Sequence, residues 1–457
     1  MAKYQKYAEY KHSGIEWLGE IPSHWDMSKL RYLFNFSKGL TITKDNLEDE
    51  GIPCVSYGEV HSKYGFEVDP TKHPLKCVNN SYLKSSENAL LNKGDFVFAD
   101  TSEDLKGSGN FTHLVNDEKV FAGYHTVIGR PFDYSVSRFY AYLFDSKEFR
   151  SQIQLAVKGV KVFSITQAML RAADVWLPSN NEKYKIANFL DHETAKIDTL
   201  IAKQEKLIEL LKEKRQAVIS HAVTKGLNPD VAMKDSGVEW LGEVPEHWMV
   251  KSYRHASKIY RGKFSHRPRN DPAFYDGEYP FIQTGDVARA GKYITSYSQT
   301  LNEKGKEVSQ LFPKGTLMMA IAANIGDLAI LGFEAYAPDS VVGFKPNQDI
   351  DLEFLRYSFM AALPALEQTS TQSTQANLNV ERIGAVQGVF PSLDDQQKIV
   401  SYLNDMLNKY SVIEREMNKA IELLQERRTA LISSAVTGKI DVRNWQHPNE
   451  AKKGLSS

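Results

Sequence analysis

The sequence lacks the features that usually identify a disulfide-rich, membrane or polybasic protein. Its two cysteines, Cys54 and Cys77, cannot form a disulfide framework, and no C-x-x-C pair suggests a zinc ribbon. No apolar run approaches the roughly 18 residues needed to span a membrane, and the polar, aromatic N-terminus is not a secretory signal. The 56 Lys and Arg against 57 Asp and Glu leave a net charge of −1, which excludes a histone-like protein but not a local basic face. These absences predict a reduced, cytoplasmic protein.

Catalytic motifs are also missing. The sequence has no G-x-x-x-x-G-K-[ST] phosphate loop, no H-E-x-x-H metal site, no G-x-S-x-G elbow and no dinucleotide-type G-x-G-x-x-G after a strand. Residues 271–274 (DPAF) are similar to the D-P-P-[YF] tetrapeptide with which amino-methyltransferases bind a flipped adenine. Because Ala273 replaces the second proline and no glycine-rich methyl-donor loop accompanies it, we interpret this segment as an ordinary turn. The 457 residues suggest two to four domains, none of which carries a recognisable enzyme signature.

The chain contains an internal duplication. Residues 13–25 read SGIEWLGEIPSHW and residues 236–248 read SGVEWLGEVPEHW, with ten of thirteen positions identical at an offset of 223. A second pair, residues 177–227 and 390–440, shares P-S, K-I and A-V-T landmarks at an offset of 213. Fainter landmarks also correspond between the heads and tails, such as Gly58-Glu59-Val60 and Gly285-Asp286-Val287. The plan is therefore head, variable segment and tail, written twice.

Each tail is expected to form one long helix. Apolar residues recur there at steps of about three and four, and Gly226 and Gly438 stand where such helices would end. Some 40 residues give a helix of roughly 60 Å, and its apolar stripe needs a partner. The other tail is the natural partner in an antiparallel coiled coil, although each stripe packing on its own domain is the alternative. The expected interface residues are Leu190, Ile197, Ile201, Ile208, Leu211, Val218, Leu403, Ile413, Ile421, Leu424 and Leu431.

The variable segments are predicted to be mixed α/β (α+β) domains. Residues 96–100, 317–323 and 341–346 have the composition of strands, and residues 136–158 and 351–368 that of helices. The expected fold is two such domains in a pseudo-two-fold arrangement, joined by the two long helices. The predicted boundaries are a head (1–25), a variable domain (26–176), a long helix (177–227), a second head (228–248), a second variable domain (249–389), a second long helix (390–440) and a polar tail (441–457).

Two kinds of segment could bind a polyanion. Residues 251–269 contain seven Lys and Arg and no acidic residue, with aromatic residues between them. Such side chains neutralise phosphates, and Arg reads guanine in the major groove, although a solvated charged face is the alternative. Residues 368–379 are rich in amides and hydroxyls, which suit base edges and phosphates, whereas their first-copy counterpart near 158–167 is basic. Different side chains at equivalent places predict two domains that read different sequences. The candidate DNA-binding residues are Lys38, Lys44, Lys106, Lys158, Lys161, Lys258, Arg261, Lys263, Arg267, Arg269, Gln372, Thr374, Gln375 and Asn377.

The repeated head, the P-S…K-I tail, the long helix that ends in A-V-T and the twofold plan resemble the specificity (S) subunit of type I restriction-modification enzymes. The resemblance covers residues 10–445, although both tails depart from the E-Q-x-x-I motif usual in that family: residues 182–186 read E-K-Y-K-I, and residues 395–399 read D-Q-Q-K-I, with the Gln at Gln396. It implies that each variable segment is a target recognition domain that reads one half of a split DNA site. It also implies that the antiparallel coiled coil fixes the gap between the halves.

The same resemblance implies a subunit with no catalytic activity, cofactor or metal of its own. It would assemble on double-stranded DNA with two methyltransferase (M) subunits, which modify adenine N6 using S-adenosylmethionine. Two motor–nuclease (R) subunits, which use ATP and Mg, would complete the restriction enzyme of a phage-defence system. The implied location is a bacterial or archaeal cytoplasm, with association to the nucleoid through DNA.

Two other functions remain open at this point. A pseudo-symmetric coiled-coil scaffold whose variable domains bind proteins would also show the duplication, and failure to bind DNA even with a methyltransferase partner would favour it. A self-contained methyltransferase or nuclease is disfavoured by the missing motifs. Methylation of DNA by the purified chain alone would restore that second alternative.

Overall fold

The computed structural model describes residues 4–157, 162–266, 269–322, 326–368 and 380–448. The chain divides into two compact units, of which unit 1 contains Met1–Gln204 with Lys419–Ser457 and unit 2 contains Glu205–Asn418. Each unit therefore holds one head, one variable domain, the first part of one long helix and the last part of the other. Among the described residues we find no helix with the length and apolar character needed to cross a bilayer.

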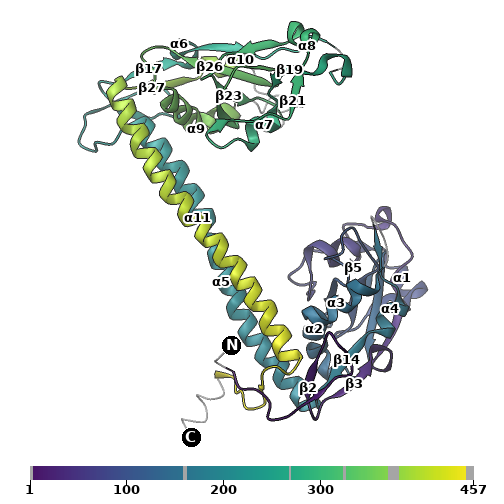
Figure 1. Cartoon of the computed structure of the whole chain (residues 1–457). Helices are drawn as coiled ribbons and strands as arrows, with labels where there is room; N and C mark the ends of the chain where they lie inside the picture. The colour runs from purple at the N-terminus through teal and green to yellow at the C-terminus, as the bar shows by residue number, and fades with distance from the viewer. Residues whose placement is uncertain (1–3, 158–161, 267–268, 323–325, 369–379, 449–457) are drawn as a thin grey trace. The chain divides into compact units, whose positions relative to one another are not determined.

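The variable domain of unit 1 is built from two sheets and a pair of helices (Figure 1). One sheet has the antiparallel order β10-β8-β12-β4, and the other has the order β6-β5-β11-β7, in which β11 runs parallel to β5. Successive side chains of a strand point to opposite faces. Strand β8 therefore packs Phe96 and Phe98 against Phe144 of helix α2 and places Val97 and Ala99 in a second core with residues of the other sheet. The bounds are β4 (Phe34–Lys38), β5 (Ile52–Val55), β6 (Cys77–Val78), β7 (Leu90–Leu91), β8 (Phe96–Ala99), β10 (Phe111–His113), β11 (Val120–Ala122), β12 (Thr126–Pro131), α2 (Ser137–Asp145) and α3 (Lys147–Ala156).

The variable domain of unit 2 repeats this topology. Its first sheet has the order β18-β26-β23-β24-β20 and its second the order β21-β19-β25-β22, in which β25 again runs parallel to β19. Leu317 and Met319 of β23 share a core with helix α9, whereas Met318 between them joins the core that includes Ile282. The bounds are β18 (Ser257–Arg261), β19 (Tyr275–Phe281), β20 (Tyr293–Ile294), β21 (Gln299–Leu301), β22 (Gln310–Phe312), β23 (Leu317–Ala320), β24 (Leu328–Leu331), β25 (Ala335–Ala337), β26 (Val341–Pro346) and α9 (Leu352–Gln368). The duplication predicted from the heads and tails thus extends through the diverged segments as a shared fold.

Short elements complete the two domains. In unit 1 they are α1 (Tyr82–Ser85), β9 (Thr101–Ser102), β13 (Phe163–Ser164) and α4 (Gln167–Ala172). In unit 2 they are α6 (Tyr253–Ala256), α7 (Thr284–Arg289), α8 (Glu303–Val308) and α10 (Val380–Ala385).

The helical structure predicted for residues 136–158 is confirmed, but it consists of two helices. Two helices, α2 and α3, occupy this stretch, and Ser146 between them has an extended backbone. Its hydroxyl accepts a hydrogen bond from the backbone N–H of Phe149, 3.3 Å away, and so caps α3. Strand 317–323 is also shorter than predicted, because β23 ends at Ala320.

Each head is a hairpin, and each variable domain begins and ends in paired strands. The hairpins are β1 (Tyr10–His12) with β2 (Glu20–Pro22), and β15 (Met233–Asp235) with β16 (Glu243–Pro245). Strand β3 (Asp26–Lys29) pairs with β14 (Asp174–Leu177), and β17 (Met249–Ser252) pairs with β27 (Gln387–Phe390). This pairing brings the two ends of each variable domain together just before its long helix starts.

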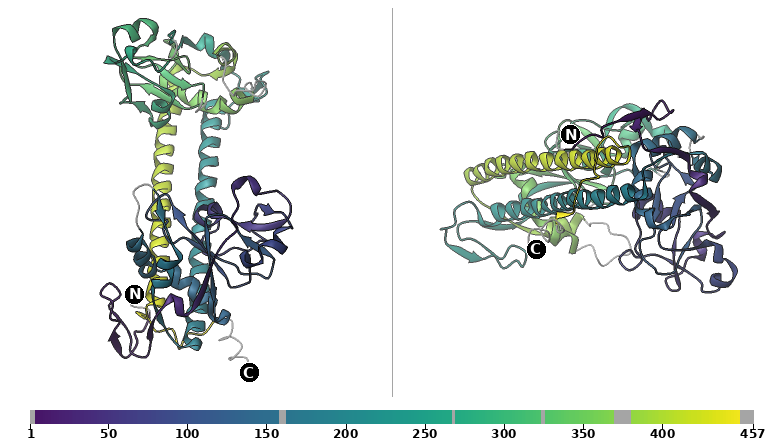
Figure 2. Two further views of the ribbon diagram at one scale, coloured as in Figure 1. Left: turned by 90° about the vertical axis from the view of Figure 1, so that its right-hand side faces the viewer. Right: turned by 90° about the horizontal axis from the view of Figure 1, so that it is seen from below.

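The long helices are α5 (Asn180–Lys225) and α11 (Leu393–Val436). Both are followed by a glycine with positive φ, +79° at Gly226 and +73° at Gly438. A Cβ atom on Gly438 would lie 2.4 Å from Pro22 and 3.2 Å from Trp25, and one on Gly226 would lie 3.1 Å from Trp248. Each helix therefore ends against the tryptophan of a head, the first head receiving α11 and the second receiving α5. Figure 2 shows the purple β1–β2 hairpin beside the yellow end of α11.

The two long helices lie side by side and run antiparallel (Figure 1). In unit 1, Nε of Arg428 lies 3.0 Å from Asp198, and in unit 2, Arg215 pairs with Glu414 at 2.9 Å. The earlier residue of α5 thus pairs with the later residue of α11, and the later residue of α5 with the earlier one of α11, as an antiparallel arrangement requires. This confirms the predicted partner and disfavours the alternative in which each stripe packs only on its own domain.

Most of the predicted interface residues lie on the paired faces. Leu190, Leu403 and Ile197 are buried, and seven others are half-buried, namely Ile201, Ile208, Leu211, Val218, Ile421, Leu424 and Leu431. The prediction for Ile413 was wrong, because its side chain is 43% exposed. Its neighbour Glu414 faces the other helix instead and pairs with Arg215. Polar residues thus occupy part of the interface between the two helices, and the spacing of apolar residues does not reveal them.

Candidate nucleic-acid interface

The basic segment of unit 2 begins on an edge strand. Strand β18 carries Lys258 and Arg261, both exposed. The Lys258 ammonium lies 5.1 Å from the centre of the Tyr260 ring, and Arg261 pairs with Glu381 at 3.1 Å. Because both members of that ion pair are 66% exposed, water screens it and it contributes little to stability. The two cations are therefore available to a polyanion at small cost.

A glycine turns the chain from β18 toward a pocket. A Cβ atom on Gly262 would lie 1.9 Å from the carbonyl oxygen of Pro338 and 2.3 Å from that of Val341, so only glycine fits. The next residue, Lys263, donates its backbone N–H to Ala337 and exposes its side chain. Phe264 then turns inward and is 3% exposed. Basic and aromatic side chains therefore alternate as the chain enters the pocket.

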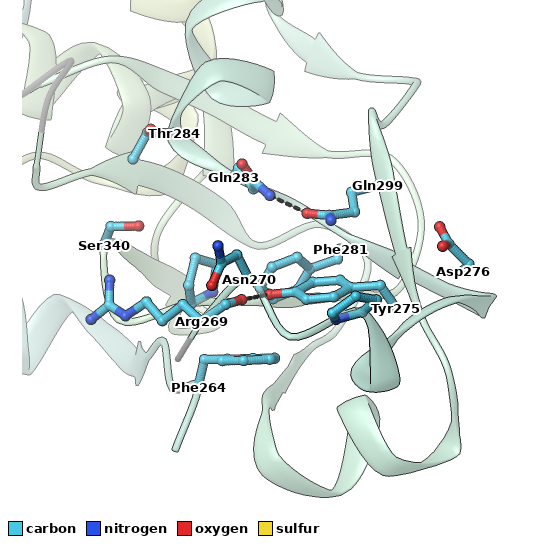
Figure 3. Close-up of a pocket in the computed structure, with 12 residues that line it drawn as sticks. Phe264, Arg269, Asn270, Tyr275, Asp276, Phe281, Gln283, Thr284, Gln299 and Ser340 are labelled. Atoms are coloured by element: carbon cyan, nitrogen blue, oxygen red, sulfur yellow. Dashed lines mark hydrogen bonds between the residues drawn. The ribbon is translucent and has the colours of Figure 1, made fainter. Parts of the chain in front are cut away.

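The pocket has a volume of about 450 Å³ and an aromatic wall (Figure 3). The ring of Phe264 stacks on that of Tyr275 at a centroid distance of 5.8 Å and lies 5.6 Å from that of Phe281. The Tyr275 hydroxyl donates to the carbonyl of Arg269, and burial raises its pKa. Flat aromatic faces of this kind are surfaces on which bases stack.

Polar side chains complete the pocket. The amide of Gln283 donates to the amide oxygen of Gln299 (Figure 3). The guanidinium of Arg269 lies 2.5 Å from Asp339. Amides and guanidinium groups are the side chains that read base edges. The pocket is lined by Phe264, Arg269, Asn270, Pro272, Tyr275, Asp276, Phe281, Gln283, Thr284, Gln299, Pro338 and Ser340.

The DPAF segment forms a turn at the side of this pocket, as the sequence indicated. A 3-10 helix covers Pro272–Phe274, and the Asp271 carboxylate accepts from the backbone N–H of Ala273 at 3.0 Å. This hydrogen bond is the main reason that the pKa of Asp271 lies below its usual range. The His266 ring stacks on Phe274 at 4.0 Å. The carboxylate therefore serves as a cap for the turn.

The equivalent place in unit 1 carries smaller side chains. Ser56 corresponds to Gln283, because the two residues stand at the same position before the matched landmarks Gly58-Glu59-Val60 and Gly285-Asp286-Val287. The backbone N–H of Ser56 donates to Glu59, and that of Gln283 donates to Asp286. Cys54, the counterpart of Phe281, is 1% exposed. A Cβ atom on Gly123 would lie 2.1 Å from the Ser56 hydroxyl. Small side chains thus pack against Gly123 where the second domain has a pocket.

The remaining predicted residues of unit 1 lie apart from one another. Lys38 ends β4, Lys44 opens a 3-10 helix over Lys44–Asn46, and Lys106 follows β9; all three are exposed. Near Lys106, the ring of His61 lies 5.2 Å from that of Tyr57. Seven predicted DNA-binding residues lie outside the described residues, namely Lys158, Lys161, Arg267, Gln372, Thr374, Gln375 and Asn377.

The sequence pattern placed Phe264 among the aromatic residues of the basic segment but missed Tyr275, Phe281 and the amides of the pocket. Tyr275 and Phe281 lie outside that segment and carry no charge. One signal could have found Gln283. It stands two residues before the landmark Gly285-Asp286-Val287, and the same position in the first copy is a serine, so the two copies differ beside a matched landmark. In the described part of the chain, no group of three or more His, Cys, Asp or Glu residues could hold a metal ion.

The chain is similar to known specificity subunits over nearly its whole length. It is 22% identical over 431 residues to the putative type I restriction enzyme MjaX specificity subunit of Methanocaldococcus jannaschii, covering 93% of this chain and 96% of that protein. It is 21% identical to the type I restriction enzyme EcoKI specificity subunit of Escherichia coli K12, covering 94% and 92%. A chain solved in a study of complex assembly and conformational transition of the type I R-M system has a similar fold, with a TM-score of 0.66 at 14% identity, covering 92% of this chain and 99% of that one.

The family model described as type I restriction modification DNA specificity domain matches this chain twice, at residues 22–210 and 257–423. Each match spans one variable domain and a large part of the long helix that follows it. Together they cover most of the chain and coincide with the duplication of the fold. The chain therefore belongs to the type I restriction modification DNA specificity domain family.

Proposed function

We propose that this chain is the sequence-reading subunit of a type I restriction-modification complex, in which each variable domain reads one half of a split DNA site. The observation that carries the proposal is the contrast between two domains of one topology. At equivalent strand ends, one domain has Phe281 and Gln283 in the lining of a pocket, and the other has the small, buried side chains of Cys54 and Ser56. A protein that recognises two different half-sites needs two domains of one fold with different surface side chains.

Different side chains of unit 2 would serve positioning and reading. Lys258 on β18 and Lys263 just before the pocket residue Phe264 are exposed cations. They would bind phosphates, which fixes orientation without reading sequence. Arg269, Gln283 and Gln299 present the hydrogen-bonding groups that distinguish bases. The antiparallel helices α5 and α11 would hold the two readers at a set distance, because helices keep distance where flexible linkers do not.

The chain itself would perform no chemistry in this assembly. Two methyltransferase subunits would modify adenine N6 with S-adenosylmethionine, and two motor–nuclease subunits would use ATP and Mg. The names of the relatives as type I restriction enzyme subunits support such partners. Double-stranded DNA in the cytoplasm would be the substrate of the whole complex.

The test is DNA binding by the chain together with a methyltransferase subunit, with Kd measured on duplex DNA at several salt concentrations. We expect log K to fall linearly with log salt, because bound phosphates release counterions. Lys263→Ala should reduce that slope by about one. Lys409→Ala on α11 is the matched control, because Lys409 is exposed but pairs with Asp405. Failure to bind DNA at every salt concentration would favour the protein-interaction scaffold.

A further inference from the structure

In unit 1 a buried carboxylate joins the first head to the long helices. Glu182, near the start of α5, is 3% exposed. Its Oε1 accepts from the Trp25 indole at 3.1 Å and from the Tyr7 hydroxyl at 2.5 Å. Nε2 of His24 lies 3.0 Å from Oε2. Both carboxylate oxygens are therefore occupied by groups of the N-terminal segment.

Tyr7 fills the space in front of that carboxylate. Its ring meets the edge of Trp25 at 5.9 Å, the Arg443 guanidinium lies 4.9 Å from its centre, and the side chain is 5% exposed. Burial, followed by the hydrogen bond to Glu182, raises the pKa of Tyr7. The backbone N–H of Asp441 donates to Gln5 at 2.8 Å. In unit 1 the segment before β1 and the segment after α11 thus close the start of α5 around one tyrosine.

Unit 2 has the same frame without the tyrosine. Pro245, His247 and Trp248 repeat Pro22, His24 and Trp25 at the offset of 223, while Asp395 and Ile399 repeat Glu182 and Ile186 at the offset of 213. Instead of a filled core, these residues line a cavity of about 380 Å³. The full lining is Lys225, Gly226, Leu227, Asn228, Val231, Pro245, His247, Trp248, Asp395, Lys398 and Ile399.

The register of the two heads identifies what is missing. The backbone bond from Ser23 to Glu9 (3.1 Å) has its counterpart in the bond from Glu246 to Ala232 (2.9 Å), so position 230 corresponds to Tyr7. Residue 230 is an exposed aspartate. Within the described chain, no hydrogen bond joins Trp248 to Asp395. In unit 2 the chain passes from α5 to β15 through residues 226–232, which include no aromatic residue.

We propose that this cavity is a binding site for a tyrosine side chain on an extended segment of a partner polypeptide. The phenol ring would lie against Trp248 between Lys225 and Lys398, and its hydroxyl would donate to Asp395. A tyrosine combines an apolar ring with one polar group. The lining offers the Trp248 ring, two lysines and the Asp395 carboxylate, which occupies the position of Glu182. That carboxylate also accepts from the Ser392 hydroxyl at 3.0 Å and lies 3.6 Å from the Lys398 ammonium, so the tyrosine hydroxyl would share it with these groups. The occupant is chosen by this internal template and does not depend on the proposed DNA function.

The probe is a fluorescein-labelled peptide with the sequence of residues 2–12, AKYQKYAEYKH, titrated with the full chain and followed by fluorescence anisotropy. We expect saturable binding. A peptide in which the tyrosine of position 7 is phenylalanine should bind at least about threefold more weakly, since one hydrogen bond to a charged acceptor is lost. The corresponding alanine peptide should not bind.

The decisive protein variant is Asp230→Tyr, which places a tyrosine at the position of Tyr7. It should abolish peptide binding and raise the melting temperature of the chain by about 2–4 °C. Asp235→Tyr, in the adjacent strand, is the matched control and should leave binding unchanged. Absence of saturable binding would overturn the proposal, as would binding that survives Asp230→Tyr or does not depend on the central tyrosine. Because the peptide variants leave the protein unchanged, a folding defect in Asp230→Tyr would not remove the test.

Discussion

Every strand pairing in the two sheets of the first variable domain recurs in the second, which adds β20, yet their surfaces differ where β5 and β19 end. In unit 1, the small side chains of Cys54 and Ser56 pack against Gly123, where an added Cβ atom would lie 2.1 Å from the Ser56 hydroxyl. In unit 2, Phe281, Gln283 and Pro338 line a pocket at the equivalent place. A few side chains at strand ends therefore change the surface while the strand register keeps the frame. In this fold, the residues that determine strand pairing are therefore different from the residues that differ between the two surfaces.

The largest expected effect comes from changing the distance between the two domains and leaving both surfaces intact. Inserting seven residues after Lys212 in α5, with a matching heptad after Ile413 in α11, adds about 10 Å of helix. If the helices set the spacing, the gap between half-sites should grow by about three base pairs, at roughly 3.4 Å each. Mapping the methylated motif in cells with the partner methyltransferase measures this gap. An unchanged gap would refute the spacing role, and an insertion in α5 alone is the control for disrupted pairing.

A smaller effect should follow from making the head of unit 1 resemble that of unit 2. Tyr7→Ala removes a buried ring and leaves Glu182 without one of its donors. We expect a loss of about 2–4 kcal/mol in the free energy of unfolding, measured by urea denaturation. Tyr32→Ala, at a side chain that is 64% exposed, should change it little. A cost as small as that of Tyr32→Ala would show that Tyr7 does not stabilise the helix end.

The smallest effect concerns a core position at which the domains differ chemically. Strand pairing places His113 opposite Phe96 and Ile330 opposite Leu317, so the two residues are equivalent. His113 stacks on Phe96 at 4.7 Å, neither ring nitrogen has a hydrogen-bond partner, and burial lowers its pKa to about 3. The folded pKa lies below the unfolded value of about 6.5, so the unfolded state binds more protons between these values. Stability should therefore fall as the pH drops below 6.5, by up to about 1.4 kcal/mol per pH unit.

His113→Ile makes this position identical to that of unit 2 and should remove that part of the acid sensitivity. The measurement is the free energy of unfolding of both proteins from pH 7 to pH 4.5. His12→Ile is the control, because His12 lies exposed in β1. Parallel stability curves for the native chain and His113→Ile would contradict the assignment of a buried, neutral imidazole.

Much of the fold could be predicted because duplication repeats each signal. The heads, the helix ends at Gly226 and Gly438, and most of the helix interface follow from local pattern. The interface prediction for Ile413 was wrong, because a polar residue, Glu414, faces the other helix there and pairs with Arg215. The helix boundary at Ser146 was not predicted, because the spacing of the apolar residues continues across the capped start of α3.

The candidate site was less predictable, because its parts meet only in the folded chain. Phe264 follows β18, Phe281 ends β19, and Gln299 begins β21. Their approach depends on the parallel pairing of β19 with β25 and on the space left at Gly262. Composition identified the basic segment, but the aromatic wall depends on this non-local pairing.

The most direct test of the account is a single-molecule methylation map of DNA from cells that carry this chain with its neighbouring methyltransferase, compared with cells that lack only this chain. The account predicts a split motif with modified adenine in each half, lost without the chain. Replacing residues 26–176 with the corresponding domain of another specificity subunit should change one half of the motif and leave the other intact. Changes in both halves, or methylation that is the same with and without the chain, would contradict the claim that two independent domains on one frame read the two halves.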